Sequence, residues 1–279
     1  MKLKAWIWGP ALALMAMAAQ ATGPASVRKQ VEASLLVTGS IDIERDGSVG
    51  GFTLDHADQL PIGVRELADR SIPGWKFEPV VLQDEAVKAR TRMSLRIVAR
   101  QAEKDRYEIT IQNASFNQAK PGQYAERDKL DPPKYPKDAV QSRVAAEVYL
   151  VVKIGRDGKV MDVVAEQVNL RTVDSERGMK RWREIFARAA IGAAREWTFF
   201  PPTWGDERDA PFWRVRVPVD FAFAQDQPRQ YGQWQAYVPG PRLAAPWAHD
   251  DQGGSDALAA GGVYPLGMGP RLLTPLNPT

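Results

Sequence analysis

The sequence predicts an α+β protein of two tandem β-β-α-β units, each an antiparallel sheet with a helix packed on one face. Two self-matches predict this fold. The stretch WKFEP, at Trp75 to Pro79, returns 122 residues later as WTFFP, at Trp197 to Pro201. Upstream, IDIERDGSV (Ile41 to Val49) matches VKIGRDGKV (Val152 to Val160) at an offset of 111. A match of this kind indicates one structural unit used twice.

Each unit is expected to begin with two strands joined by a tight turn. The residues on both sides of the turn are apolar at alternate positions, which is the period of a strand with one buried face. Between them lie Asp-Gly pairs ending in Gly47 and Gly158, and glycine accepts the positive φ that a tight hairpin requires. The second copy carries 11 extra residues, which we place in the polar stretch from Leu170 to Lys180.

A helix and a closing strand are expected to complete each unit. Apolar residues at three- and four-residue spacings predict a helix around residues 64–68 and again around 182–190. The closing strands are expected at residues 93–99 and 215–223, with a further strand at 107–111 pairing beside the first of them. One face of each helix should cover its sheet.

The repeated aromatic motif is interpreted as a structural anchor where helix meets strand, because large aromatic side chains contribute most to a small core. The proline that ends each motif cannot donate to a strand ladder, so it closes the run. The predicted anchors are Trp75, Phe77, Pro79 and Gly47 in the first unit, and Trp197, Phe199, Pro201 and Gly158 in the second.

The chain divides into five predicted segments. Residues 1–21 carry two lysines, an apolar run and a small-residue cleavage site, which is typical of a secretory signal peptide. Residues 31–116 and 132–224 are the two units, and the polar residues 117–131 are the linker between them. Residues 225–279 are rich in Gly, Pro, Ala and Gln, which predicts a disordered tail.

Composition argues against several classes of function. The chain has no cysteine, which excludes disulfides, thiolate metal sites and cysteine nucleophiles. Its net charge of +3 falls to +1 without Lys2 and Lys4, so no nucleic-acid partner is expected. The two histidines, His56 and His249, lie in a polar connection and in the predicted tail, so we expect no metal site and no cofactor.

The Tyr-Pro pair, the Asp-Gly hairpin and the Trp-x-Phe-x-Pro motif occur in one order within residues 132–224, and together they resemble the C-terminal domain of the TonB energy-transducer family. One departure is Ala146, where the family usually has glycine. Residues 31–116 resemble the same domain more faintly, as a divergent copy without the Tyr-Pro pair. The resemblance implies a non-enzymatic interaction module whose exposed sheet edge accepts an extended peptide by strand addition.

What the resemblance implies for a partner is an envelope protein, such as the periplasmic segment of an outer-membrane transporter. The basic side chains of the closing strands, among them Arg92, Arg96 and Arg100, are expected on the solvated side of their sheets, or as a strip for an acidic partner segment. The predicted partner-binding residues are Tyr135, Pro136, Arg214, Arg216, Val217 and Val219.

Three alternatives stay open at this stage. With a cleaved signal the protein is periplasmic; with an uncleaved one it is anchored in the inner membrane and serves energy transduction in transmembrane transport. An envelope hydrolase is the alternative from another class, although no nucleophile elbow or phosphate-binding loop occurs in the sequence. Exposed strand edges also allow the two sheets to pair within one chain, or between two chains as a homodimer.

Overall fold

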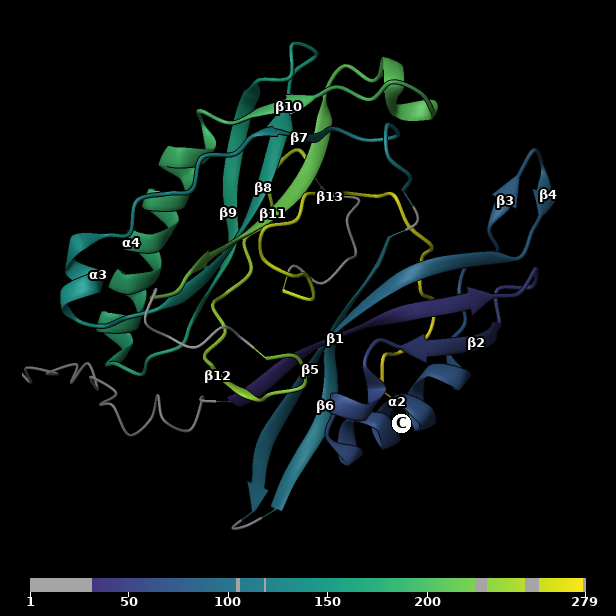
Figure 1. The fold of residues 1–279 in the computed structure, drawn as a ribbon, viewed down its shortest axis with the longest axis horizontal. Coiled ribbons are helices and arrows are strands. Elements are labelled where there is room, and N and C mark those ends of the chain that lie inside the picture. Colours follow the sequence, from purple (N-terminus) through teal and green to yellow (C-terminus); the bar gives the residue numbers. More distant parts are fainter. Residues whose placement is uncertain (1–31, 104–105, 118, 224–229, 249–255, 278–279) are drawn as a thin grey trace, which may run out of the picture.

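The structure, a computed structural model, describes residues 32–103, 106–117, 119–223, 230–248 and 256–277 (Figure 1). These residues form helices and antiparallel sheets, so the predicted α+β class is confirmed. The predicted signal peptide lies outside the described residues.

The first unit contains β1 (Glu32–Ile43), β2 (Val49–Leu54), η1 (Ala57–Gln59), α2 (Ile62–Ser71), η2 (Ile72–Gly74), β3 (Val81–Leu82), β4 (Glu85–Ala86), β5 (Ala89–Glu103) and β6 (Arg106–Asn117). Within the described residues its main sheet has five strands, in the order β12-β1-β5-β6 with β2 also paired to β1, where β12 is Gln235–Tyr237. Helix α2 buries Val64, Leu67 and Ala68 against this sheet. The strand predicted at residues 107–111 is part of β6 and pairs with β5.

The second unit contains α3 (Lys137–Gln141), β8 (Ala146–Ile154), β9 (Val160–Leu170), α4 (Glu176–Ala194), β10 (Thr198–Phe200), η3 (Asp206–Asp209) and β11 (Trp213–Phe221). Its main sheet has four strands in the described part of the chain, in the order β13-β11-β8-β9, where β13 is Tyr264–Pro265. The extra residues of this copy lengthen both β9 and α4, which have 11 and 19 residues against 6 in β2 and 10 in α2. The sequence had suggested that these residues lie in a surface connection, but they lie largely within these two elements.

The predicted linker takes part in the second unit. Strand β7 (Glu126–Lys129) pairs with β10, and Ala125 beside it is fully buried in the second core. The indole of Trp197 donates to the carbonyl of Asp131 at 2.8 Å. Residues 117–131 are therefore packed structure for much of their length, because the backbone groups of β10 need a partner.

The repeated motifs make the same contact in both units. The amide of Phe77 donates to the carbonyl of Gly47, and that of Phe199 to the carbonyl of Gly158, both at 2.8 Å. The two glycines have φ of 84° and 76°, and an added Cβ would lie 2.0 and 2.2 Å from the phenylalanine carbonyl oxygens. Trp75 is buried in the first core, like Phe77, as Trp197 and Phe199 are in the second. Each motif thus fastens the helix-to-strand corner onto its hairpin turn.

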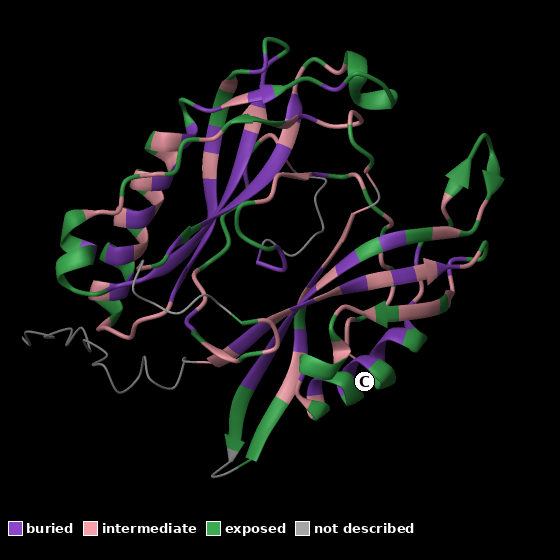
Figure 2. Ribbon diagram, in the orientation of Figure 1, coloured by how far each residue is buried: buried purple, intermediate pink, exposed green. Residues whose placement is uncertain are grey.

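The two units turn their helix-free sheet faces toward each other. Helices α2 and α4 cover the outer faces, and the C-terminal part of the chain runs between the sheets (Figure 1). Burial is concentrated along the central strands, while the β3–β4 hairpin and the end of the β5–β6 hairpin are exposed (Figure 2). A direct contact joins the sheets, because Arg96 on β5 donates to the hydroxyl of Tyr149 on β8 at 3.0 Å.

The predicted disordered tail is wrong for the residues that the structure describes, 230–248 and 256–277. Tyr231, Trp234, Leu272 and Leu276 pack against the first core, and β12 pairs with β1. The composition of this segment explains the error. It has too few apolar residues to fold alone, but it buries those it has against two preformed sheets.

Candidate partner-binding edge

Strand β11 is the edge that the sequence assigned to a partner, and it is covered along part of its length. Residues 261–266, here called the edge strap, run antiparallel to it, with Val215 opposite Pro265 and Arg216 opposite Tyr264. The amide of Leu266 donates to the carbonyl of Arg214 at 3.1 Å. The expectation of an exposed edge is therefore wrong over residues 214–218, because the chain supplies its own strand.

The other end of the edge strap meets a proline in β11. The amide of Gly261 donates to the carbonyl of Pro218 at 3.2 Å. Pro218 has no N–H to return, so the ladder is interrupted there. Proline in an edge strand limits uncontrolled pairing with other chains.

Two of the predicted contact residues point into the core of the second unit. Val217 and Val219 are buried in the cluster that β11 shares with β8 and α4. Alternation along the strand places them on the helix-covered face, so they cannot meet a partner by their side chains. Their assignment as partner contacts was therefore wrong.

Arg216 was expected on a solvated sheet face and is buried instead, with 3% of its surface exposed. Its guanidinium donates to both carboxylate oxygens of Glu166 on β9, at 2.7 and 3.0 Å. Arg242, from the C-terminal segment, donates to the same carboxylate at 2.8 Å. Arg214 is half-buried. The C-terminal segment covers this face, which a pattern of alternating residues could not reveal.

Arg96, in the first sheet, was likewise expected on a solvated face and is buried instead. It donates to the backbone carbonyl of Asp256 at 2.8 Å, and its guanidinium lies 3.6 Å from the carboxylate of Glu147. Asp256 is itself fully buried and accepts from Asn113 at 2.5 Å. Its carboxylate also accepts from the hydroxyl of Tyr237. This polar cluster ties the C-terminal segment to both units.

Burial shifts the titration of two tyrosines in the same cluster. Desolvation raises the pKa of Tyr149 well above its usual value, and the neighbouring Glu147 adds to the effect. Desolvation followed by the charge of Asp256 raises the pKa of Tyr237. Both phenols therefore stay protonated well into the alkaline range and act as hydrogen-bond donors.

The Tyr-Pro pair fixes the approach to the second unit. The hydroxyl of Tyr135 donates to the carbonyl of Val144 at 2.8 Å, and its ring stacks on Phe223 with centroids 4.9 Å apart. Pro136 is the N-cap residue of α3. Tyr135 thus holds the segment that leads into α3 beside the end of β11, and these contacts are internal to the unit.

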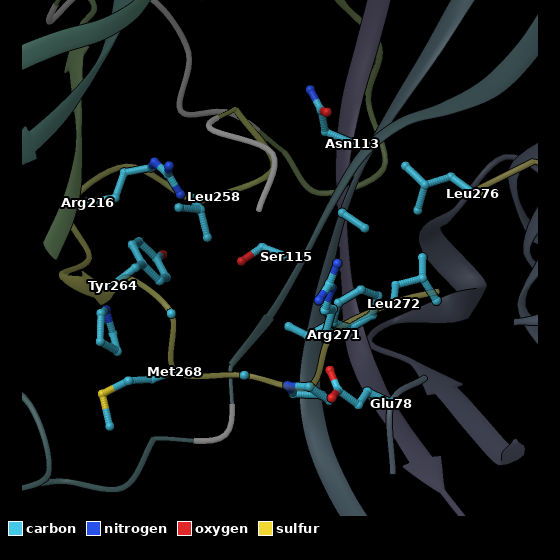
Figure 3. A pocket seen from close by; sticks show the side chains of 16 residues that line it. Glu78, Asn113, Ser115, Arg216, Leu258, Tyr264, Met268, Arg271, Leu272 and Leu276 are labelled. Atoms are coloured by element: carbon cyan, nitrogen blue, oxygen red, sulfur yellow. The ribbon is translucent and has the colours of Figure 1, made fainter. Parts of the chain in front are cut away.

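A cavity of about 470 Å³ lies between the two units, beside the edge strap. Figure 3 shows Arg216 and Tyr264 on one side of it, and Asn113 and Ser115 of β6 facing them. Arg271 lies among the residues on the far side. The edges of the two sheets therefore face a common opening.

The described residues contain no group of three or more His, Cys, Asp or Glu side chains placed to hold a metal ion. His56 makes an edge contact with the ring of Tyr231, and His249 lies outside the described residues. Across the part of the chain that the structure covers, none of the helices has the length and apolar character to cross a membrane.

The chain is similar to two curated proteins, both named Protein TonB, from Xanthomonas campestris pv. campestris strains B100 and ATCC 33913. Each is 38% identical over 93 residues, which is 33% of this chain and 35% of the relative. The chain thus matches about a third of the length of these relatives, and the match supports a TonB-like domain. No family model matches the chain, and no solved structure matches it.

Proposed function

We propose that this protein is a non-enzymatic component of the cell envelope that binds an extended segment of a partner protein along β11. The observation that carries this proposal is the 38% identity to Protein TonB over a third of the chain. The resemblance in residues 132–224 suggests the kind of partner, an envelope protein such as the periplasmic segment of an outer-membrane transporter. A role in energy transduction is the alternative that the same resemblance supports.

Strand addition at β11 depends on backbone groups more than on side chains. The outer side of β11 carries the carbonyls of Arg214 and Pro218, which accept from the edge strap. The side chain of Val217 faces the core, and that of Arg216 is held by Glu166. A partner strand would therefore gain its affinity from the ladder and from the positions that the edge strap now fills.

The first unit is proposed to be a divergent copy of the second. The same order of strands and helix, and the matching contacts of Phe77 with Gly47 and Phe199 with Gly158, support this proposal. Two units of common origin would explain why one chain carries the motif twice.

The location of the protein remains a proposal drawn from residues 1–21, and it can be measured directly. Intact mass of the protein from fractionated cells would separate the two alternatives. A chain beginning near Thr22 in the periplasmic fraction supports export with cleavage. A full-length chain in the inner membrane supports the anchored form.

Site-specific cross-linking tests the binding proposal. A photoreactive amino acid at Ala222, exposed directly after β11, should form an adduct with an envelope protein in cells that produce this chain. The matched control places the same group at Glu184, exposed on α4 and away from the edge. Equal adducts from both positions, or none from Ala222, would count against binding along β11.

A further inference from the structure

We infer that the edge strap is an internal occupant of the β11 edge, which an extended, uncharged and apolar segment of the partner displaces. This inference rests on the proposed function and adds the chemistry of the partner. The edge strap, residues 261–266, has the sequence GGVYPL. In the absence of the partner, the edge strap would occupy the same position along β11 as the partner segment.

The edge strap already adopts the geometry of an added strand. It is antiparallel to β11, and its register is defined by Arg216 opposite Tyr264. Backbone bonds at Leu266 and Gly261 extend the pairing on both sides of the two-residue β13. A peptide bound by strand addition makes the same kind of contact.

The side chains of the edge strap indicate what the site selects. Val263 packs against the core of the second unit. Leu266 is 7% exposed and joins a small apolar cluster with Val151 of β8 and Ala245. Two apolar positions three residues apart therefore occupy defined contacts on this sheet.

A charged partner segment would be excluded by the surroundings of the site. The edge strap contains no charged residue, and Leu266 sits among apolar side chains. Arg216 and Glu166, two buried charges beside the site, already compensate each other at 2.7 Å. A buried charge without a counter-charge is strongly unfavourable, so the partner segment should be apolar at the positions of Val263 and Leu266.

The edge strap can leave its site without unfolding the rest of the C-terminal segment. Before it, Asp256 is held in the buried polar cluster between the sheets. After it, the amide of Leu273 donates to the carbonyl of Lys76 at 2.7 Å, and the carbonyl of Arg271 accepts from the amide of Glu78 at 2.8 Å. Both ends are thus fixed independently of β11.

The segment between these fixed ends is suited to local opening. Gly261 and Gly267 bracket it with φ of 83° and 74°, and a Cβ added at either would meet no atom within 4 Å. The cavity of about 470 Å³ lies along it, lined by Tyr264 and Pro265. Segments with few packed neighbours on one side are those that open before the whole protein unfolds.

Hydrogen exchange of the unmodified full chain provides the first test. The amide of Leu266, paired with Arg214, should exchange at least tenfold faster than that of Leu150 in the central strand β8. If the two amides exchange at the same rate across denaturant concentrations, the edge strap opens only with global unfolding. That result would overturn the inference.

A reversible lock provides the second test. Val215 and Pro265 face each other across the ladder, so Val215→Cys with Pro265→Cys should form a disulfide, and the natural chain has no other cysteine. The probe is a labelled peptide of residues 259–268. Reduced protein should bind it, and oxidised protein should not. The control lock, Ala33→Cys with Ala236→Cys, holds β12 to β1 and should leave binding unchanged on oxidation.

An open variant makes the affinity measurable. Tyr264→Pro with Leu266→Pro removes the strap amides that pair with β11. Because a tethered strand competes at an effective concentration of about millimolar, the full variant chain should bind the peptide at least tenfold more tightly than the natural chain. A peptide with aspartate in place of Val263 and Leu266 should not bind to it.

The outcomes separate this inference from the proposed function. If the open variant retains its circular dichroism spectrum but binds the peptide no better than the natural chain, the edge strap is not an occupant of a binding edge. The same holds if the oxidised lock binds as well as the reduced one. Cross-linking from Ala222 would still test the proposed function, because it detects a partner whatever displaces the edge strap.

Discussion

Replacing Glu166 with leucine tests whether the buried charges hold the C-terminal segment against the second sheet. In the folded protein the guanidinium of Arg216 donates to both oxygens of this carboxylate, and both side chains are 4% exposed. Removing one member of a buried pair leaves an uncompensated charge, which costs about 3–5 kcal/mol. Arg242 is 42% exposed, so the loss of its contact adds at most about 1 kcal/mol.

Urea unfolding measures this loss as a change in the free energy of unfolding. Asp138→Ala is the control, because Asp138 pairs with Arg181 at 3.2 Å where both side chains are largely exposed, and its loss should cost at most about 1 kcal/mol. Glu166→Leu combined with Arg216→Met should recover most of the stability, since no unpaired charge remains. A single Glu166→Leu variant as stable as Asp138→Ala would refute the argument.

Two further predictions concern the repeated helix-to-strand corner and the buried polar cluster around Asp256. Gly47→Ala and Gly158→Ala should each lower the free energy of unfolding by at least about 1–2 kcal/mol, because each glycine has a positive φ and lies against a phenylalanine carbonyl. Gly192→Ala in α4, where an added Cβ meets no atom within 4 Å, should instead raise it by about 0.5–1 kcal/mol, and an equal loss at all three positions in thermal unfolding would contradict the proposed geometry. Burial raises the pKa of Tyr149 and Tyr237, so the stability they contribute is fully present below about pH 10 and is lost as the pH rises beyond it. Tyrosinate absorbance should show these two phenols ionising only with unfolding, and their titration in the folded protein at the usual pKa would contradict their burial.

Local patterns in the sequence predicted the elements of both units well. Alternation and the Asp-Gly pairs located the hairpins at Gly47 and Gly158, and apolar spacing located α2 and α4. These signals are local, because turn chemistry and the period of a helix or strand act within a few residues. The pairing of β5 with β6 was predicted on the same basis.

The contacts between units could not be predicted in this way. Arg96 and Arg216 follow the pattern of a solvated sheet face, and only the course of the C-terminal segment buries them. Asp256 carries no local sign of burial, since its partners lie more than 80 residues away in β6 and β9, apart from Tyr237. The low complexity of residues 225–279 predicted disorder, but the described parts of this segment pack against the two sheets, which supply the apolar surface that the segment lacks.

The sequence placed the candidate site on β11 but gave no sign that another segment of the chain covers this strand. Motif order pointed to β11, whereas the half of the ladder supplied by residues 261–266 has no motif of its own. The one local signal available was that the stretch GGVYPL is short, uncharged and carries apolar residues. Strand pairing between segments about 50 residues apart depends on the whole fold, so it could not be assigned from that stretch.

Cross-linking from Ala222 in the lockable protein tests the central claim most directly. The variant carries Val215→Cys and Pro265→Cys. The adducts are mapped by mass spectrometry in cell envelopes kept under reducing or under oxidising conditions. We predict an adduct with an extended, uncharged segment of an envelope protein, which disappears when the disulfide holds the edge strap on β11. An adduct of equal yield in both states, or one equally strong from Glu184, would contradict the claim that the partner binds along β11.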